Sequence, residues 1–174
     1  MMKGPMHTIA SRLATLAITA MLAASCGIYS FSGTSIQPDV NTITINYFEY
    51  TALKVNPSLS NDLTEALKTQ FRKMTRLEQV EMDGDLEITG AVTGYDVSTA
   101  AVTADEVAAR NKLTVTVKIT FTNRKYPEDD LEQNFSAYSE YDSTNSLESV
   151  ESTLCAEIVD KLIEDIFNAT VAQW

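Results

Sequence analysis

Cys26 is the residue of this sequence with the clearest chemistry, because its thiol directly follows the small residues Leu22-Ala23-Ala24-Ser25. Two basic residues lie near the amino terminus, and residues 13–24 form an apolar segment without a charged side chain. A positive region, a short apolar region and a small-residue boundary are typical of a secretory signal peptide. Because about 20 apolar residues are needed to span a bilayer, this segment is too short to remain as a transmembrane helix.

The run Leu22-Ala23-Ala24-Ser25-Cys26 resembles a bacterial lipobox. The resemblance implies that the Cys26 thiol is diacylglycerylated, that the chain is cut before it, and that the new amino terminus is acylated as well. Residues 1–25 are then a lipoprotein signal peptide. Two or more acyl chains hold a protein firmly on a membrane, at about 0.8 kcal/mol for each buried methylene. The alternative is a secreted protein in which Cys26 is an ordinary thiol.

The only histidine and the second cysteine of the sequence give little support to a catalytic function. His7 is the only histidine and lies in the segment that we expect to be removed. A mature chain without histidine has no imidazole for a metal and cannot run a Ser-His-Asp or Cys-His mechanism. Cys155 stands at helical spacing beside Leu154 and Ile158, which is typical of a small buried residue. We therefore expect no metal and no cofactor apart from the covalent lipid on Cys26.

Paired carboxylates are the other candidates for catalysis, and they occur as Asp83-Gly84-Asp85 and Asp129-Asp130. Both groups lie in predicted turns, without a neighbouring apolar segment that could raise the pKa of one carboxyl group for acid-base work. Solvated turn residues are a more common use of such pairs than calcium ligands. The sequence therefore favours a protein that is not an enzyme.

Length and charge limit the classes of partner. Removal of residues 1–25 from the 174 leaves 149, which is enough for one domain with a core. We assign residues 26–41 to a lipidated N-terminal tether and residues 42–174 to a single domain. The mature chain carries 11 basic and 24 acidic residues, so its formal charge is 11 − 24 = −13. Nucleic acid is therefore not expected as a partner.

Apolar periodicity predicts two helices and four strands. The strands are expected at residues 42–50, 86–97, 111–123 and 132–142, and the helices at about 57–74 and from Ser146 nearly to Trp174. In the first strand, Ile43, Ile45 and Tyr47 would share one face. In the second, Gly90 marks close packing, and a change of apolar phase after Gly94 predicts a bulge. Residues 99–109 are predicted to form a loop.

The predicted order is β-α-β-β-β-α, which indicates an α+β fold. Each helix is apolar on one side only and needs a sheet face to cover. The strand at residues 111–123 alternates strictly, with Leu113 and Val115 on one face and Thr114 and Thr116 on the other. We therefore expect two amphipathic helices packed on one face of a four-stranded mixed sheet, with the threonine-rich face left open.

Several segments together resemble the short form of the LptE family of lipopolysaccharide-assembly lipoproteins. They are Ser25–Phe31, Tyr47-Phe48 followed by Asn56-Pro57 and the first helix, Asp85–Tyr95, Lys112–Asn123 and the closing helix through Ala169. The resemblance implies a non-enzymatic outer-membrane lipoprotein on the periplasmic side. Its partner would be the LptD β-barrel, whose assembly it assists while lipopolysaccharide is delivered to the outer leaflet. The alternative is a periplasm-facing lipoprotein that binds a ligand or peptide on its open sheet face.

Five basic residues are candidates for contact with lipopolysaccharide phosphates, to which cations make charge-assisted hydrogen bonds. Lys68, Arg72 and Arg76 recur every four residues on one helix face with Lys73 at its margin, and Lys118 stands among threonines on the open sheet face. The alternative for the helical group is that cations near the carboxyl end of a helix stabilise the helix dipole.

Each of two sites near the carboxyl end of the chain has two possible interpretations. Trp174 is either an anchor at a protein interface or a cover for the end of the core. Asp142-Ser143-Thr144 resembles an O-glycan acceptor of exported bacterial proteins, and a helix-capping loop would explain the same residues.

Overall fold

The computed structural model describes residues 36–100 and 109–171, which lie within one compact unit of the chain. The predicted signal segment, Cys26 and Trp174 fall outside these residues. The elements are β1 (Thr42–Ile45), β2 (Glu49–Tyr50), α2 (Leu59–Met74), β3 (Glu78–Gln79), β4 (Leu86–Thr99), β5 (Arg110–Asn123), the 3-10 turn η1 (Pro127–Asp129), β6 (Leu131–Asp142) and α3 (Leu147–Val171).

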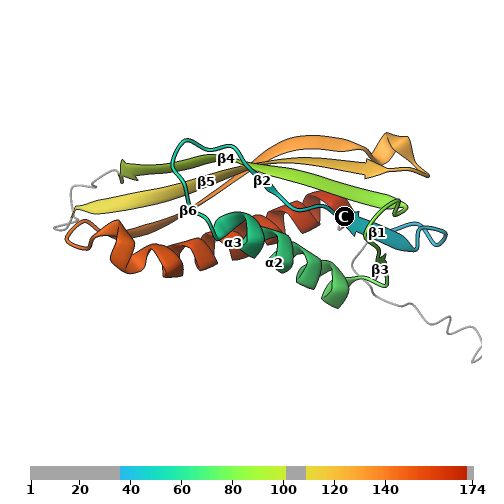
Figure 1. Ribbon diagram of the computed structural model, residues 1–174, viewed down its shortest axis with the longest axis horizontal. Helices are drawn as coiled ribbons and strands as arrows, with labels where there is room; N and C mark the ends of the chain where they lie inside the picture. The colour runs from blue at the N-terminus through green and yellow to red at the C-terminus, as the bar shows by residue number, and fades with distance from the viewer. Residues whose placement is uncertain (1–35, 101–108, 172–174) are drawn as a thin grey trace, which may run out of the picture. The chain divides into compact units, whose positions relative to one another are not determined.

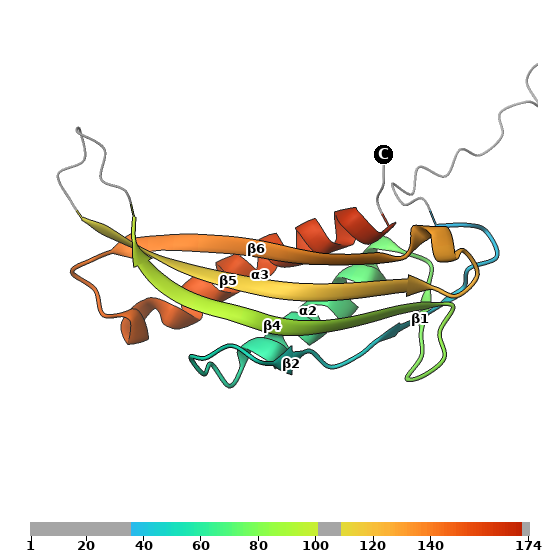
Figure 2. The same cartoon turned by 90° about the horizontal axis from the view of Figure 1, so that it is seen from above.

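The strands form one mixed sheet in the order β3-β1-β4-β5-β6, with β2 paired to β4 beyond the end of β1 (Figure 2). β1 is parallel to both β3 and β4, whereas β4, β5 and β6 form an antiparallel meander. The expected α+β class and mixed sheet are confirmed. The expected number of four strands is wrong, because the sheet has six. The additional pairing comes from the two-residue strands β2 and β3, which are too short to show a period in the sequence.

The expected continuous strand over residues 42–50 is interrupted between β1 and β2. Ile45 pairs with Ile88 and Glu49 pairs with Ala91, so this segment uses one more residue than β4 over the same stretch. The additional residue reverses the alternation of side chains, as in a bulge. Phe48 is therefore fully buried and Tyr47 is 62% exposed, which is the opposite of the predicted placement of Tyr47 with the core residues.

Both helices cover the same face of the sheet, as Figure 1 shows. α3 packs on β5 and β6, α2 packs on β1, and the rings of Phe71 and Phe167 meet edge to face with centroids 5.1 Å apart. The alternate residues of β5 that were predicted to face the core, from Leu113 to Phe121, are at most 2% exposed. The predicted arrangement of two helices on one face is thus confirmed.

The start of α2 depends on Asn56 rather than on Pro57. The helix begins at Leu59, two residues after the proline that was expected to open it. The Oδ1 atom of Asn56 accepts hydrogen bonds from the backbone N–H groups of Ser58 and Leu59, at 3.2 and 3.3 Å. Backbone N–H groups at the start of a helix have no partner within the helix, so this side chain satisfies them.

The two irregularities that were predicted in β4 are both present. The register of β4 against β5 shifts between Val92 and Gly94, which confirms the bulge. A methyl group placed at Gly90 would lie 2.8 Å from Cζ of Phe48, so a glycine here allows the Phe48 ring to reach the core. β4 itself runs to Thr99, and most of the predicted loop over residues 99–109 lies outside the described residues.

Candidate functional site

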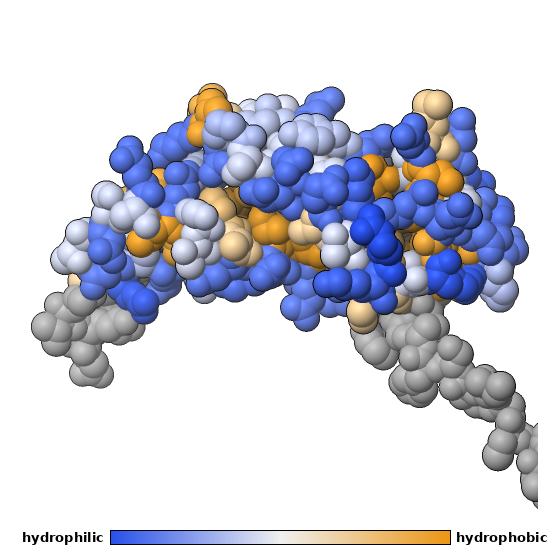
Figure 3. Space-filling model, turned by 60° about the horizontal axis from the view of Figure 1, so that its bottom comes forward, coloured by the Kyte–Doolittle hydropathy of each residue, from blue (hydrophilic) through white to orange (hydrophobic). Residues whose placement is uncertain are grey.

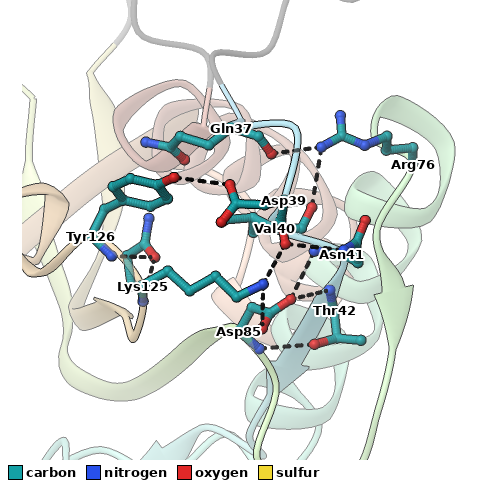
Figure 4. A network of polar contacts seen from close by, with 10 residues as sticks. Gln37, Asp39, Val40, Asn41, Thr42, Arg76, Asp85, Lys125 and Tyr126 are labelled. Carbon is teal, nitrogen blue, oxygen red and sulfur yellow. Dashed lines mark hydrogen bonds and ion pairs between the residues drawn. The ribbon is translucent and has the colours of Figure 1, made fainter.

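The segment that joins the predicted lipid anchor to the domain is held by side chains from distant parts of the chain (Figure 4). The guanidinium group of Arg76, just beyond α2, donates hydrogen bonds to the backbone carbonyls of Gln37 and Val40, at 2.6 and 3.1 Å. The Tyr126 hydroxyl, from the β5–β6 connection, donates to the Asp39 carboxylate at 2.9 Å. This last bond raises the pKa of Tyr126, because the carboxylate favours the protonated phenol.

Asp85 binds the same segment from the start of β4. One oxygen of its carboxylate accepts hydrogen bonds from the backbone N–H groups of Asn41 and Thr42, at 2.8 and 3.2 Å. The other oxygen lies 3.1 Å from the Lys125 ammonium, which also donates to the backbone carbonyl of Asp39. The N–H of Asn41 and the Lys125 ammonium lower the pKa of Asp85. We call Arg76, Asp85, Lys125 and Tyr126, together with residues 37–42 that they hold, the N-terminal clamp.

The structure separates Lys68, Arg72 and Arg76, which were predicted to share one helix face with Lys73 at its margin. Lys68 and Arg72 line a hollow of about 440 Å³ beside Tyr47. Lys68 pairs with Glu65 at 3.0 Å, and Arg72 donates to the side chain of Gln79 at 3.2 Å. Glu65 and Glu81 also line this hollow, so its charge is mixed.

The other predicted cations point elsewhere. Lys73 lines a different hollow between the two helices, and Arg76 belongs to the N-terminal clamp. Lys118 lies on the open sheet face, where its ammonium is 2.5 Å from the carboxylate of Glu132. Their role in contact with lipopolysaccharide stays a prediction, and so does that of Lys68 and Arg72.

The sheet face opposite the helices is uncovered in the described part of the chain (Figure 1). It presents the threonines of β5 that were predicted there, with Thr120 opposite Thr89 of β4 and Thr116 opposite Ser136 of β6. The hydroxyl groups of Thr116 and Ser136 lie 3.2 Å apart.

Sequence reasoning missed an aromatic and cationic cluster on β6. Tyr138 is 51% exposed, and the ammonium groups of Lys112 and Lys161 lie 5.0 and 5.9 Å from the centre of its ring. The Lys161 ammonium also donates to the backbone carbonyl of Tyr138 at 2.8 Å, which occupies part of the free edge of β6. Finding this cluster requires the β5–β6 register, which pairs Lys112 with Glu140 and Thr114 with Tyr138, and the placement of Lys161 on α3 beside β6.

Between the helices, two hollows of about 630 and 730 Å³ share Glu65, Ala66 and Asp160 and so form one groove. Figure 3 shows apolar side chains exposed on this side of the molecule between polar ones. The apolar lining residues include Met74, which is 54% exposed, and Ile163.

A polar cluster lies at one end of this groove, around the predicted buried cysteine. Cys155 is 6% exposed, as expected, and its Sγ lies 3.6 Å from Nδ2 of Asn56. Glu151 accepts hydrogen bonds from Asn56 and from the hydroxyl of Tyr95. Burial raises the pKa of the Cys155 thiol, and burial together with the bond to Glu151 raises the pKa of Tyr95. Both groups therefore stay protonated at neutral pH, where the thiol is a weak nucleophile.

The paired carboxylates stabilise loops. Asp83 is exposed and pairs with Arg124, whereas Asp85 belongs to the N-terminal clamp rather than standing free in solvent. Asp129 accepts hydrogen bonds from Gln37 and Asn123.

Within the described residues, no group of three or more histidine, cysteine or acidic side chains is placed to bind a metal ion. No helix of those residues has the length and apolarity needed to cross a membrane.

The turn at residues 142–144 has the geometry of a connecting loop. The N–H and the hydroxyl of Thr144 both donate to the Asp142 carboxylate, at 2.8 and 2.6 Å, and these bonds lower the pKa of Asp142. Glycosylation of Ser143 or Thr144 stays a prediction.

Comparison with known proteins gives the following similarities. The model of the family LptE, described as lipopolysaccharide-assembly, matches residues 40–170. A hypothetical protein from Chlamydia trachomatis is 5% identical, with a TM-score of 0.50 over 75% of this chain and 97% of that chain, which is a similarity of fold alone. A minor lipoprotein from Acinetobacter baumannii is 17% identical, with a TM-score of 0.44 over 69% and 89% of the two chains. No curated protein matches the sequence significantly.

Proposed function

Because the chain belongs to the LptE family of lipopolysaccharide-assembly proteins, we propose that it is an outer-membrane lipoprotein that associates with the LptD β-barrel. In this role it assists assembly of the barrel and transport of lipopolysaccharide to the outer leaflet. The observation that carries the proposal is the family match over residues 40–170, which runs from just before β1 almost to the end of α3.

The attachment to the membrane is the covalent lipid on Cys26, on the periplasmic side of the outer membrane. Residues 27–32 after this cysteine carry no charge, which fits retention at the outer membrane. The protein has no catalytic role in this proposal and needs no cofactor. Support comes from Asp85, Asp129, Glu151 and Cys155, which are engaged in hydrogen bonds that hold loops and the start of α2.

The open sheet face is the surface that we assign to the barrel. Because the helices bury the other face, the threonine-rich side is the sheet face that is open to a partner in the described part of the chain. Hydroxyl groups such as those of Thr116 and Thr120 can donate hydrogen bonds to, and accept them from, another backbone or side chain.

Lys68 and Arg72, in their hollow, are the candidates for contact with lipid phosphates. Trp174 is the candidate anchor against the barrel.

Copurification tests this assignment. The lipidated protein is extracted from native outer membranes in a nonionic detergent, and the proteins that accompany it are identified. We expect a large β-barrel protein in stoichiometric amount with the native chain, and its loss when Cys26→Ser prevents lipidation. Depletion of the protein should leave the barrel misassembled and lipopolysaccharide held back from the cell surface. A normal cell surface after depletion would rule out the proposed role.

The same uncovered face supports a second candidate, a periplasm-facing lipoprotein that binds a ligand or peptide there. The observation in its favour is that Thr89, Thr116 and Thr120 lie on a face without a partner element in the described residues. This candidate predicts a protein that is monomeric after extraction and brings no barrel with it. The copurification experiment therefore separates the two candidates.

A further inference from the structure

Three stretches of the chain, at Arg76, Asp85 and Lys125-Tyr126, hold residues 37–42, of which residues 37–41 have no regular secondary structure. We propose that the N-terminal clamp shortens the lipid tether and thereby keeps one end of the domain close to the membrane. The inference rests on the lipid attachment of the proposed function and adds an orientation to it.

The hydrogen bonds of the clamp reduce the number of residues between Cys26 and the first residue that is fixed to the domain. If the whole segment came free, including the buried Val40 side chain, the first fixed residue would be Thr42 at the start of β1, sixteen residues after Cys26 (42 − 26). With the clamp, Gln37 is already held by Arg76, eleven residues after Cys26 (37 − 26). At 3.3 to 3.6 Å for each residue, the greatest reach falls from about 53–58 Å to about 36–40 Å.

The contacts of the clamp act on the backbone, which suits a role in fixing the chain path. Arg76 donates to the carbonyls of Gln37 and Val40, and the Asp85 carboxylate accepts from the N–H groups of Asn41 and Thr42. The Val40 side chain is fully buried, so the segment is also held by the core. Charge-assisted hydrogen bonds are about twice as strong as neutral ones, so these are effective anchors.

The position of the clamp decides which end of the domain is restrained. The start of β1 and the β5–β6 connection lie at one end of the sheet, and the turn between β6 and α3 lies at the other (Figures 1 and 2). A tether that leaves the domain at the clamp therefore brings the first end toward the bilayer.

Energy transfer from the protein to the bilayer tests this orientation. The lipidated chain is reconstituted in vesicles of phosphatidylethanolamine and phosphatidylglycerol that contain an acceptor-labelled lipid. A donor dye is attached either through M82C, in the turn before β4, or through N145C, in the turn before α3. Cys155 is buried and should react little with the dye. We expect greater transfer from position 82 than from position 145.

The variant Arg76→Gln removes two of the hydrogen bonds to the segment, leaves those from Asp85, Tyr126 and Asp129, and should reduce the difference between the two positions in part. Arg124→Gln is the matched control, because the Arg124 side chain binds Asp83 and Glu87 and makes no contact with residues 37–42. This control should keep the difference of the native chain. Deletion of residues 29–33 from the Arg76→Gln variant removes the added length and should restore the difference, whereas a merely structural role of Arg76 would not be rescued in this way.

Should Arg76→Gln fail to fold, Tyr126→Phe and a five-residue Gly/Ser insertion after residue 33 replace it, since the insertion leaves every clamp contact intact. The insertion should reduce the difference between the positions. Equal transfer from both positions in the native chain would overturn the inference, and so would an unchanged difference in the clamp and insertion variants. A chain that does not bind vesicles at all would overturn the lipid attachment of the proposed function and this inference with it.

Discussion

Asp85 shows at the scale of one residue how a turn carboxylate can stabilise a fold. Its folded-state pKa lies below the ordinary value of 3.8, chiefly because the N–H of Asn41 donates to it and the Lys125 ammonium is close. A lowered pKa means that the carboxylate stabilises the fold above pH 3.8, and that this contribution is lost as the pH falls through the folded-state pKa.

We therefore expect Asp85→Asn to lower the free energy of unfolding at pH 7 by roughly 1 to 2 kcal/mol. The difference from the native chain should shrink as the pH falls below 3.8, measured by urea unfolding at a series of pH values. Asp83→Asn is the control, because its side chain is 82% exposed and does not contact residues 37–42. A difference that is independent of pH would contradict the explanation.

Gly90 is a second residue whose substitution has a predictable sign. Alanine would ordinarily stabilise a strand by roughly 0.5 to 1 kcal/mol relative to glycine. Here its methyl group would lie 2.8 Å from the buried Phe48 ring, and overpacking of a core costs about 1 to 3 kcal/mol. Gly90→Ala should therefore reduce the free energy of unfolding. Addition of Phe48→Leu should recover part of that loss, and strictly additive effects would show that the ring is not the cause.

At the scale of elements, α2 depends on a residue outside the helix. Asn56→Ala removes the acceptor of the first N–H groups of the helix and the amide that donates to Glu151. The free energy of unfolding should fall by about 1 to 2 kcal/mol. Ser58→Ala should change it by a few tenths only, because the Ser58 side chain makes no capping hydrogen bond. Equal effects of the two substitutions in urea unfolding would contradict this account.

The elements with a long, regular pattern could be predicted from the sequence, and the short or irregular ones could not. β5 alternates from Leu113 to Phe121, and α3 repeats its apolar residues over its whole length, so both were found close to their observed bounds. The division into β1 and β2 depends on one additional residue near Phe48 that leaves no mark in composition. β3 has two residues and forms only because β1 lies beside it.

The same distinction applies to the candidate site. Helical spacing placed Lys68, Arg72 and Arg76 on one face, but it could not show that Arg76 binds the Val40 carbonyl, 36 residues earlier in the chain. The N-terminal clamp was missed because most of its contacts with residues 37–42 are to the backbone, which every residue carries. A group of polar residues that meet only in the folded chain has no spacing that a sequence could display.

At the scale of the whole molecule, the two faces of the domain should differ in their effect on the partner. The pair Thr116→Arg and Thr120→Arg adds two bulky charges to the open sheet face, and Ser152→Arg and Ala156→Arg add two to the exposed side of α3. We expect the first pair to lower the yield of copurified barrel by about tenfold, which corresponds to roughly 1.4 kcal/mol.

The second pair should leave that yield unchanged, and thermal unfolding should show similar stability for both. An equal loss of barrel with the two pairs would mean that the sheet face is not the preferred contact surface.

The N-terminal clamp also has a consequence for the order of folding. Asn41 bonds to Asp85, 44 residues later, and Asp39 bonds to Tyr126, 87 residues later. Contacts between such distant residues form slowly because a long loop must close first, whereas the β4–β5–β6 meander joins neighbours along the chain. In the proposed export across a membrane, the N-terminal segment would emerge first, and its partners would follow only after most of the domain had crossed. The beginning of the domain is therefore among the last parts to reach its native position.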